Sequence, residues 1–156
     1  MARGRRSNRR TRRAAPRRNP AAITDMYFCT VPSASTQALN RDTFPILKSM
    51  GDRPFRVAGI SIEYSSPLPC LVQFRCYGPS MTDNINSSGV LMAGPQPRRR
   101  NLRSRGSWFP GNTAGSTTLA AIDVLRSDTV RAQTDVRATF VVRIRFFVAP
   151  PELQSR

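Results

Sequence analysis

Residues 136–148 read VRATFVVRIRFFV, and this stretch is the strongest fold signal in the chain. Apolar side chains occupy every second position along its whole length. Such alternation is typical of a β-strand that buries one face and shows the other to water. The stretch ends just before Pro150, which cannot donate a hydrogen bond to a sheet ladder. It therefore predicts a long strand whose polar face carries Arg137, Arg143 and Arg145.

Other short runs alternate in the same way and are bounded by proline, glycine or serine. The clearest of them predict strands over residues 23–31, 55–64, 70–77, 90–93 and 117–126. The last run also allows a short helix capped by Ser116 or Thr117, and we favour the strand. With the weaker runs counted, seven or eight short strands and no long helix predict an all-β antiparallel sandwich or barrel.

Three local features refine this pattern. Pro32 and the Ser/Thr-rich residues 33–37 are predicted to end the first strand. Residues 78–97 are predicted to be loop, apart from the short strand at 90–93. Gly59 interrupts the alternation of residues 55–64 and is predicted to mark a β-bulge.

The N-terminal stretch has the opposite character, because it contains nothing that could form a core. Residues 3–18 hold nine arginines, no acidic residue and no apolar residue larger than alanine. Charge repulsion, together with Pro16 and Pro20, predicts a flexible, disordered arm over residues 1–20, ahead of one domain at 21–156. The arginines of the arm are Arg3, Arg5, Arg6, Arg9, Arg10, Arg12, Arg13, Arg17 and Arg18.

The charge balance indicates a polyanionic partner. The formal net charge is +16, and Lys48 is the only lysine among 25 basic residues. Arginine suits phosphate, because its guanidinium fork can bond two phosphate oxygens at once. We therefore predict that the arm binds single-stranded RNA through its phosphates, without reading the base sequence.

A second basic cluster near residue 100 allows two interpretations. It could extend the RNA-facing surface, with Trp108 as a platform for stacked bases. It could equally be an edge strand protected by charge, with Trp108 as a packing residue. The further candidate RNA-facing residues are Arg98, Arg99, Arg100, Arg103, Arg105, Trp108, Arg137, Arg143 and Arg145.

Catalysis and metal binding find little support. The chain has no histidine, which removes the commonest general base and metal ligand. Asp123, Asp128 and Asp135 could at most contribute to an oxygen-ligated cation site, and solvated or arginine-paired carboxylates are the simpler interpretation. We expect a non-enzymatic protein with no catalytic residue, no cofactor and no metal.

The cysteines and the hydropathy complete the picture. Cys29, Cys70 and Cys76 lack the spacing of a metal site and lie in apolar runs, so we predict buried free thiols. No apolar run reaches the ~18 residues of a membrane span, and no signal peptide is recognisable, so no membrane partner is expected.

An arginine-rich arm joined to one small all-β domain resembles the capsid proteins of small icosahedral satellite viruses. The resemblance covers essentially the whole chain and is carried by RGRRSNRRTRR (3–13), ITDMYFCTVPS (23–33), GISIEYSSPLPCLVQFRCYG (59–78) and RATFVVRIRFFVAPP (137–151). It implies an eight-stranded antiparallel jelly-roll sandwich and a T=1 shell of about 60 identical subunits around single-stranded RNA. It also implies residence in the virion, with host-cell cytoplasm before assembly, and dependence on a helper virus.

The rival interpretation is a cellular RNA-binding or ribosomal-type protein that acts as a monomer. The near absence of lysine, the concentration of charge at one end and the lack of an RNP-like aromatic motif argue against it.

Overall fold

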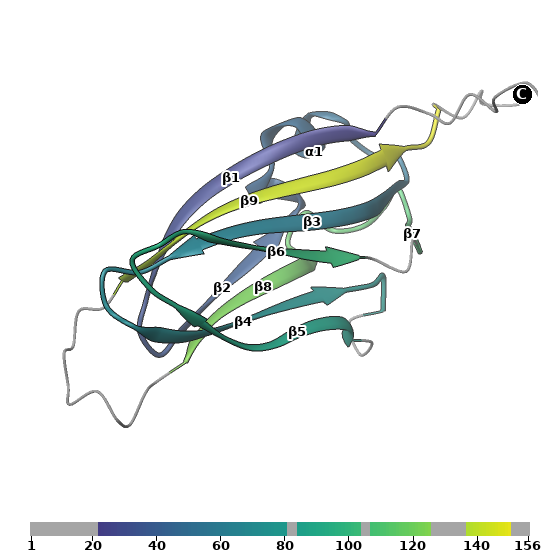
Figure 1. Cartoon of the computed structure of the whole chain (residues 1–156). Helices are drawn as coiled ribbons and strands as arrows, with labels where there is room; N and C mark the ends of the chain where they lie inside the picture. Colours follow the sequence, from purple (N-terminus) through teal and green to yellow (C-terminus); the bar gives the residue numbers. More distant parts are fainter. Residues whose placement is uncertain (1–21, 81–83, 104–106, 126–136, 151–156) are drawn as a thin grey trace, which may run out of the picture.

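The alternating stretch at the C-terminal end forms β9, the longest strand described. The computed structural model describes residues 22–80, 84–103, 107–125 and 137–150. In the first sheet the strands lie in the order β1-β9-β3-β6, with β7 paired to one end of β3, and in the second the order is β2-β8-β4-β5 (Figure 1). The strands are β1 (Ile23–Pro32), β2 (Ser35–Asn40), β3 (Phe55–Ser65), β4 (Cys70–Tyr77), β5 (Asn84–Ala93), β6 (Arg98–Arg103), β7 (Trp108–Phe109), β8 (Thr118–Leu125) and β9 (Arg137–Val148).

The strand pairing follows the path of one long hairpin that has been rolled up. Apart from the two-residue β7, the first strand pairs with the last, β2 with β8, β3 with β6, and β4 with β5. Rolling this hairpin brings β3 beside β9 and β4 beside β8, again antiparallel. This is the eight-stranded jelly roll, so the sandwich expected from the alternation is confirmed.

The core lies between the two sheets and is formed by the inward rows of the strands. Phe74 of β4 and Phe140 of β9 meet edge-to-face across it, with ring centroids 5.9 Å apart. Tyr64 of β3 lies against the same Phe74 ring at 5.4 Å. The three cysteines are free and buried, as predicted. The central aromatic contact therefore joins the strand that identified the fold to the opposite sheet.

A bulge in β3 corrects the alternation at the predicted place. The register with β9 shifts between Val57 and Gly59, so Ala58 is the extra residue. Val57 and Ile60 are both buried although they are three positions apart, because the bulge inserts one additional residue between two inward-facing ones. The result leaves Gly59 and Ser61 on the outward face.

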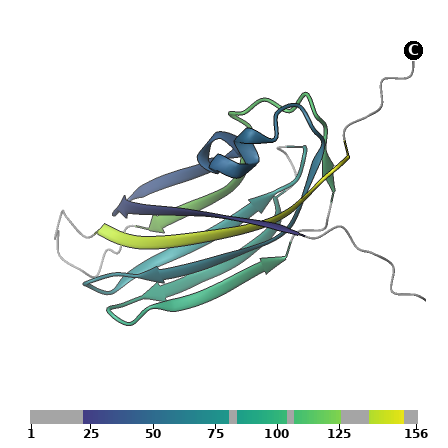
Figure 2. The same cartoon turned by 90° about the horizontal axis from the view of Figure 1, so that it is seen from above.

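Two stretches differ from the prediction, and a third forms an element that the sequence does not predict. The first strand does end at Pro32, but residues 35–40 form the edge strand β2, which only Leu39 anchors in the core. Residues 84–93 form the ten-residue β5 rather than mostly loop. Residues 45–49 form the short helix α1 (Pro45–Ser49), which lies beside β1 (Figure 2).

Polar side chains account for β5 and α1. In β5 the hydroxyl of Ser88 accepts a hydrogen bond from the backbone N–H of Phe74 at 2.9 Å, where the ladder is irregular. Helix α1 has no side-chain cap from its own N-cap residue, Phe44. Asp25 of β1 takes this role, because it accepts a hydrogen bond from the N–H of Ile46 at 2.7 Å. Both contacts join residues far apart in the sequence through polar groups, so neither produces a hydrophobic periodicity that would predict the element.

We predict that Phe140→Ala lowers the free energy of unfolding by about 3–5 kcal/mol, because it removes a fully buried ring from the contact between the sheets. Val141→Ala, next along the strand and facing outward, is the matched control and should cost less than about 1 kcal/mol. Urea denaturation of dilute protein measures both. Equal losses would show that the sheets are not held together at this ring.

Burial raises the pKa of the Cys29 and Cys76 thiols to about 11. Unfolding restores the ordinary value near 9, so between about pH 9 and 11 only the unfolded chain loses these protons, and stability falls as pH rises through this range. We therefore expect both thiols to resist a thiol reagent at pH 8 until denaturant is added. Replacing both cysteines with alanine should reduce the alkaline loss of stability; an unchanged pH profile would contradict the assignment.

Candidate nucleic-acid interface

The outward face of the first sheet carries the arginines of β9 and β6 in cross-strand rows. In the first row Arg145 and Arg103 are the two Cα partners of Gly59. In the next row Arg143 and Asn101 flank Ser61 in the same way. Glycine and serine therefore form the floor between two strands that bear long cationic side chains.

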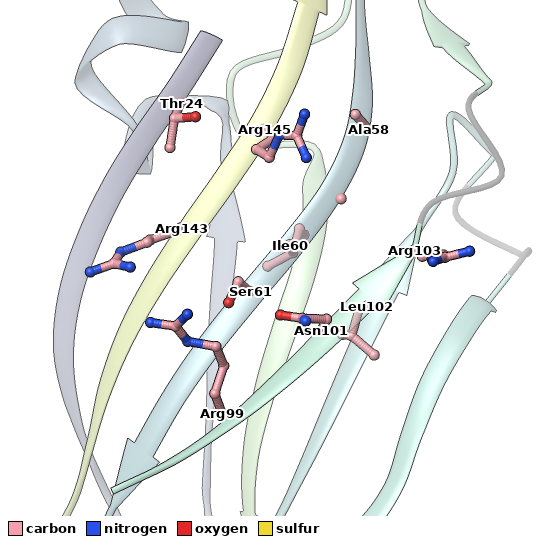
Figure 3. Close-up of a pocket in the computed structure, with 11 residues that line it drawn as sticks. Thr24, Ala58, Ile60, Ser61, Arg99, Asn101, Leu102, Arg103, Arg143 and Arg145 are labelled. Carbon is pink, nitrogen blue, oxygen red and sulfur yellow. The ribbon is translucent and has the colours of Figure 1, made fainter. Parts of the chain in front are cut away.

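A hollow of about 490 Å³ lies over this floor. It is lined by residues of β1, β3, β6 and β9, and four of its side chains are arginines (Figure 3). Thr24, Ser61 and Asn101 add hydroxyl and amide groups. The lining arginines are Arg99, Arg103, Arg143 and Arg145.

The arginines do not all point the same way. In Figure 3, Arg99 extends from β6 back toward β9, and Arg145 extends from β9 toward β3, whereas Arg103 points away from the others. Arg143 extends from β9 the other way, toward β1. Arg99 and Arg145 are thus the cations placed over the centre of the face, and Arg143 lies on its β1 side.

These cations have few acidic partners within the described residues. A weak ion pair joins Arg99 to Glu63, with Nη2 and Oε2 3.8 Å apart and both side chains well exposed. No ion pair of Arg103, Arg143 or Arg145 occurs in the same part of the chain. An exposed pair at this distance contributes little free energy, so the face remains strongly positive.

The outward face of the second sheet shows the contrast. There Arg75 and Asp123 form a two-pronged pair, with Nε 2.7 Å from Oδ2 and Nη2 donating to Oδ1 at 2.9 Å. Thr36 also donates its hydroxyl to Asp123. The hydrogen bond from Arg75 to this carboxylate raises the pKa of the guanidinium. The arginine of this face is neutralised, whereas those of the first sheet are not.

The other candidate residues lie elsewhere. Arg98 and Arg100 alternate with Arg99 along β6 and therefore point to its other side, and Arg137 lies at the far end of β9 opposite Pro32. Strand β6 is an edge strand, as the second interpretation expects, and it also contributes to the hollow. That this cluster faces RNA stays a prediction. Arg105 and the nine arm arginines lie outside the described residues.

Trp108 is about half exposed on β7, and its ring is stacked by an arginine that the sequence did not single out. The guanidinium of Arg56 lies 5.5 Å from the Trp108 ring centroid and 4.8 Å from that of Phe147. Cation–π contacts of this kind stabilise the local packing. Trp108 is therefore a packing residue on one side and solvent-exposed on the other.

Two apolar residues of the face were missed in the sequence. Met26 and Phe28 of β1 point outward and are 55% and 63% exposed. In the register they stand opposite Arg143 and Val141. The signal was present, since both alternate with the buried Cys29 and so had to lie on the polar face.

Nothing in the described ranges indicates a metal centre, because no three potential ligands among their His, Cys, Asp and Glu side chains come together. Of the three aspartates considered above, Asp123 is paired as described, and Asp128 and Asp135 lie outside these ranges. No helix in the described part is long and apolar enough to cross a membrane.

The jelly roll occurs in viral capsid domains and also in lectin domains and cupins, so the fold alone does not assign the function. A family model described as Potexvirus coat protein matches residues 3–156. The chain therefore belongs to this coat-protein family, and it is a structural protein of the virion.

Several solved structures are similar to the chain at low identity and low TM-score. The coat protein of tobacco streak virus is 15% identical with a TM-score of 0.43, over 85% of this chain and 91% of that one. The protein of the Macrobrachium rosenbergii nodavirus virus-like particle is 8% identical with a TM-score of 0.44, over 96% of this chain and 94% of that one. A Bacillus endospore appendage protein is 9% identical with a TM-score of 0.42, over 85% and 92%. Such distant likenesses add nothing to the functional assignment, which depends on the family match.

Proposed function

We propose that this coat protein packages single-stranded RNA, and that residues 1–20 are the RNA-binding arm of a shell domain at 21–156. The observation that carries the proposal is the density of arginine in residues 3–18, nine in sixteen positions without one acid. Nine phosphate contacts on a single strand would make log affinity fall with log salt at a slope of about −6. A flexible arginine chain gives such binding without base specificity.

The assembled form we propose is a closed T=1 icosahedral shell of about 60 identical subunits. The supporting observation is the resemblance of the whole sequence to small satellite-virus capsid proteins, in particular that of satellite panicum mosaic virus. The same resemblance supports synthesis in the host-cell cytoplasm before assembly and dependence on a helper virus. A monomeric cellular RNA-binding protein is not favoured, because the chain belongs to a coat-protein family.

Deleting residues 3–18 should remove most of the packaged RNA while leaving the shell domain folded, because these residues carry charge and contribute no large apolar side chain. Replacing the same nine arginines with lysine keeps the charge and is the matched control. The absorbance ratio at 260 and 280 nm of purified particles measures RNA, and thermal unfolding reports on the fold. Normal RNA content in the deletion variant would exclude the arm as the packaging element.

Charge balance predicts the size of the packaged RNA. About 60 subunits at +16 each would be neutralised by on the order of 1,000 phosphates. We therefore expect RNA extracted from particles to be roughly 1,000 nucleotides long. RNA several times longer, without polyamines in the particle, would contradict charge matching.

A further inference from the structure

The outward face of the first sheet combines two chemical features that are costly when left alone. Arg143 and Arg145 lie two residues apart on β9, about 7 Å at the rise of a strand, and neither has an ion pair within the described residues. This is the spacing along the backbone, and the two side chains leave β9 on opposite sides, Arg145 toward β3 and Arg143 toward β1. Successive phosphates of one strand could supply each guanidinium with the anion that it lacks.

The middle of the face is open to a ligand because its side chains are small. Gly59 and Ser61 lie between the arginine-bearing strands, so a phosphodiester backbone could approach the sheet closely there. A side chain at Gly59 would also be constrained, since an added Cβ would lie 3.3 Å from the carbonyl oxygen of Leu102. Thr24, Ser61 and Asn101 supply hydrogen-bond donors around the same hollow.

The β1 side of the face adds an exposed aromatic ring. Phe28 stands opposite Val141 and is therefore the diagonal neighbour of Arg143, about 7–8 Å away between Cα atoms. Binding sites for single-stranded nucleic acid commonly combine a cationic groove with exposed aromatic rings, because phosphates bind the cations while bases stack on the rings. A duplex would hide its bases from Phe28.

We propose that this face is a second binding surface for single-stranded RNA that acts independently of the arm. Arg99 and Arg145 hold phosphates over the floor formed by Gly59 and Ser61. Arg143 holds a further phosphate on the β1 side, where Phe28 stacks one base. The proposal rests on the proposed function, since it takes RNA as the ligand.

A second copy of the chain fits this surface less well. Pairing two such faces would bring the arginines of both copies together, and Glu63 is the acidic residue that stands among their strands, already beside Arg99. The large exposed apolar side chains of this face are Met26 and Phe28 on β1 and Trp108 on β7, so they come from separate strands. Single-stranded RNA instead offers phosphates to the arginines and a base that can stack on Phe28.

The test uses the full-length chain with the nine arm arginines replaced by serine, and a 12-nucleotide oligouridylate as the probe. Fluorescence anisotropy at several salt concentrations should show binding with a slope of log affinity against log salt near −2, as expected for about three phosphate contacts. The double variant Arg143→Ser, Arg145→Ser should give a shallower slope, with a magnitude of less than about 1. Arg98→Ser with Arg100→Ser is the control of equal charge, on the other side of β6, and should leave the affinity within about twofold.

The aromatic part of the proposal is tested in the same protein. Phe28→Ala should weaken oligouridylate binding about tenfold, the loss of one stacked base, and should leave binding of inorganic tripolyphosphate unchanged. Val90→Ala, an equally exposed apolar residue on β5 of the other sheet, should change neither.

The outcomes separate this inference from the function on which it rests. If wild-type protein binds the probe and the serine-arm protein does not, the face is not a binding surface and the arm proposal stands. If wild-type protein does not bind, the proposed function itself is wrong. If the Arg143/Arg145 variant and the Arg98/Arg100 variant lose the same affinity, binding depends only on the total charge, and the proposed surface is wrong. If Phe28→Ala prevents particle assembly without changing probe affinity, the face is a subunit contact and the inference is overturned.

Discussion

The structure depends on a steric constraint, namely that a strand in a two-layer sandwich has one face that must be dry and one that is free. The dry faces meet through rings such as Phe74 and Phe140, and replacing an inward residue with a charge would leave that charge buried without a partner. The outward positions carry no such requirement. The chain can therefore hold a net charge of +16 and still form a core, because nine arginines stand in residues 3–18 and most charged side chains of the described residues are not buried. The buried Asp25 accepts hydrogen bonds from two backbone N–H groups.

The parts of the fold that were predictable are those in which this constraint is visible in every residue. Residues 70–77 and 137–148 alternate without interruption, and both form strands where expected. The edge strands β2 and β5 were missed or cut short because an edge strand buries little, and in β5 the hydroxyl of Ser88 replaces one backbone acceptor of the ladder. Helix α1 depends on a cap from Asp25, twenty-one residues earlier, which a local pattern cannot reveal.

The candidate site divides in the same way. That Arg143 and Arg145 face outward followed from the period of the strand alone. That Arg99 joins them, while Arg98 and Arg100 do not, depends on the register of β6 against β3, which is a long-range property. The bulge at Ala58 could be anticipated from Gly59, but its effect of placing small residues between two cationic strands required the order of strands in the sheet.

The two basic regions differ in what each can do for an assembling coat. An arm of arginines has many equivalent ways to meet phosphates, so it would condense RNA without fixing where the strand runs. Side chains on β6 and β9 extend from backbone positions whose spacing the strand register sets, so their charges are confined to one face. Bringing many +16 subunits together is opposed by their mutual repulsion until an anion is present. Under the proposed function, neutralisation by RNA and closure of the shell are therefore a single coupled step, since each lowers the free-energy cost of the other.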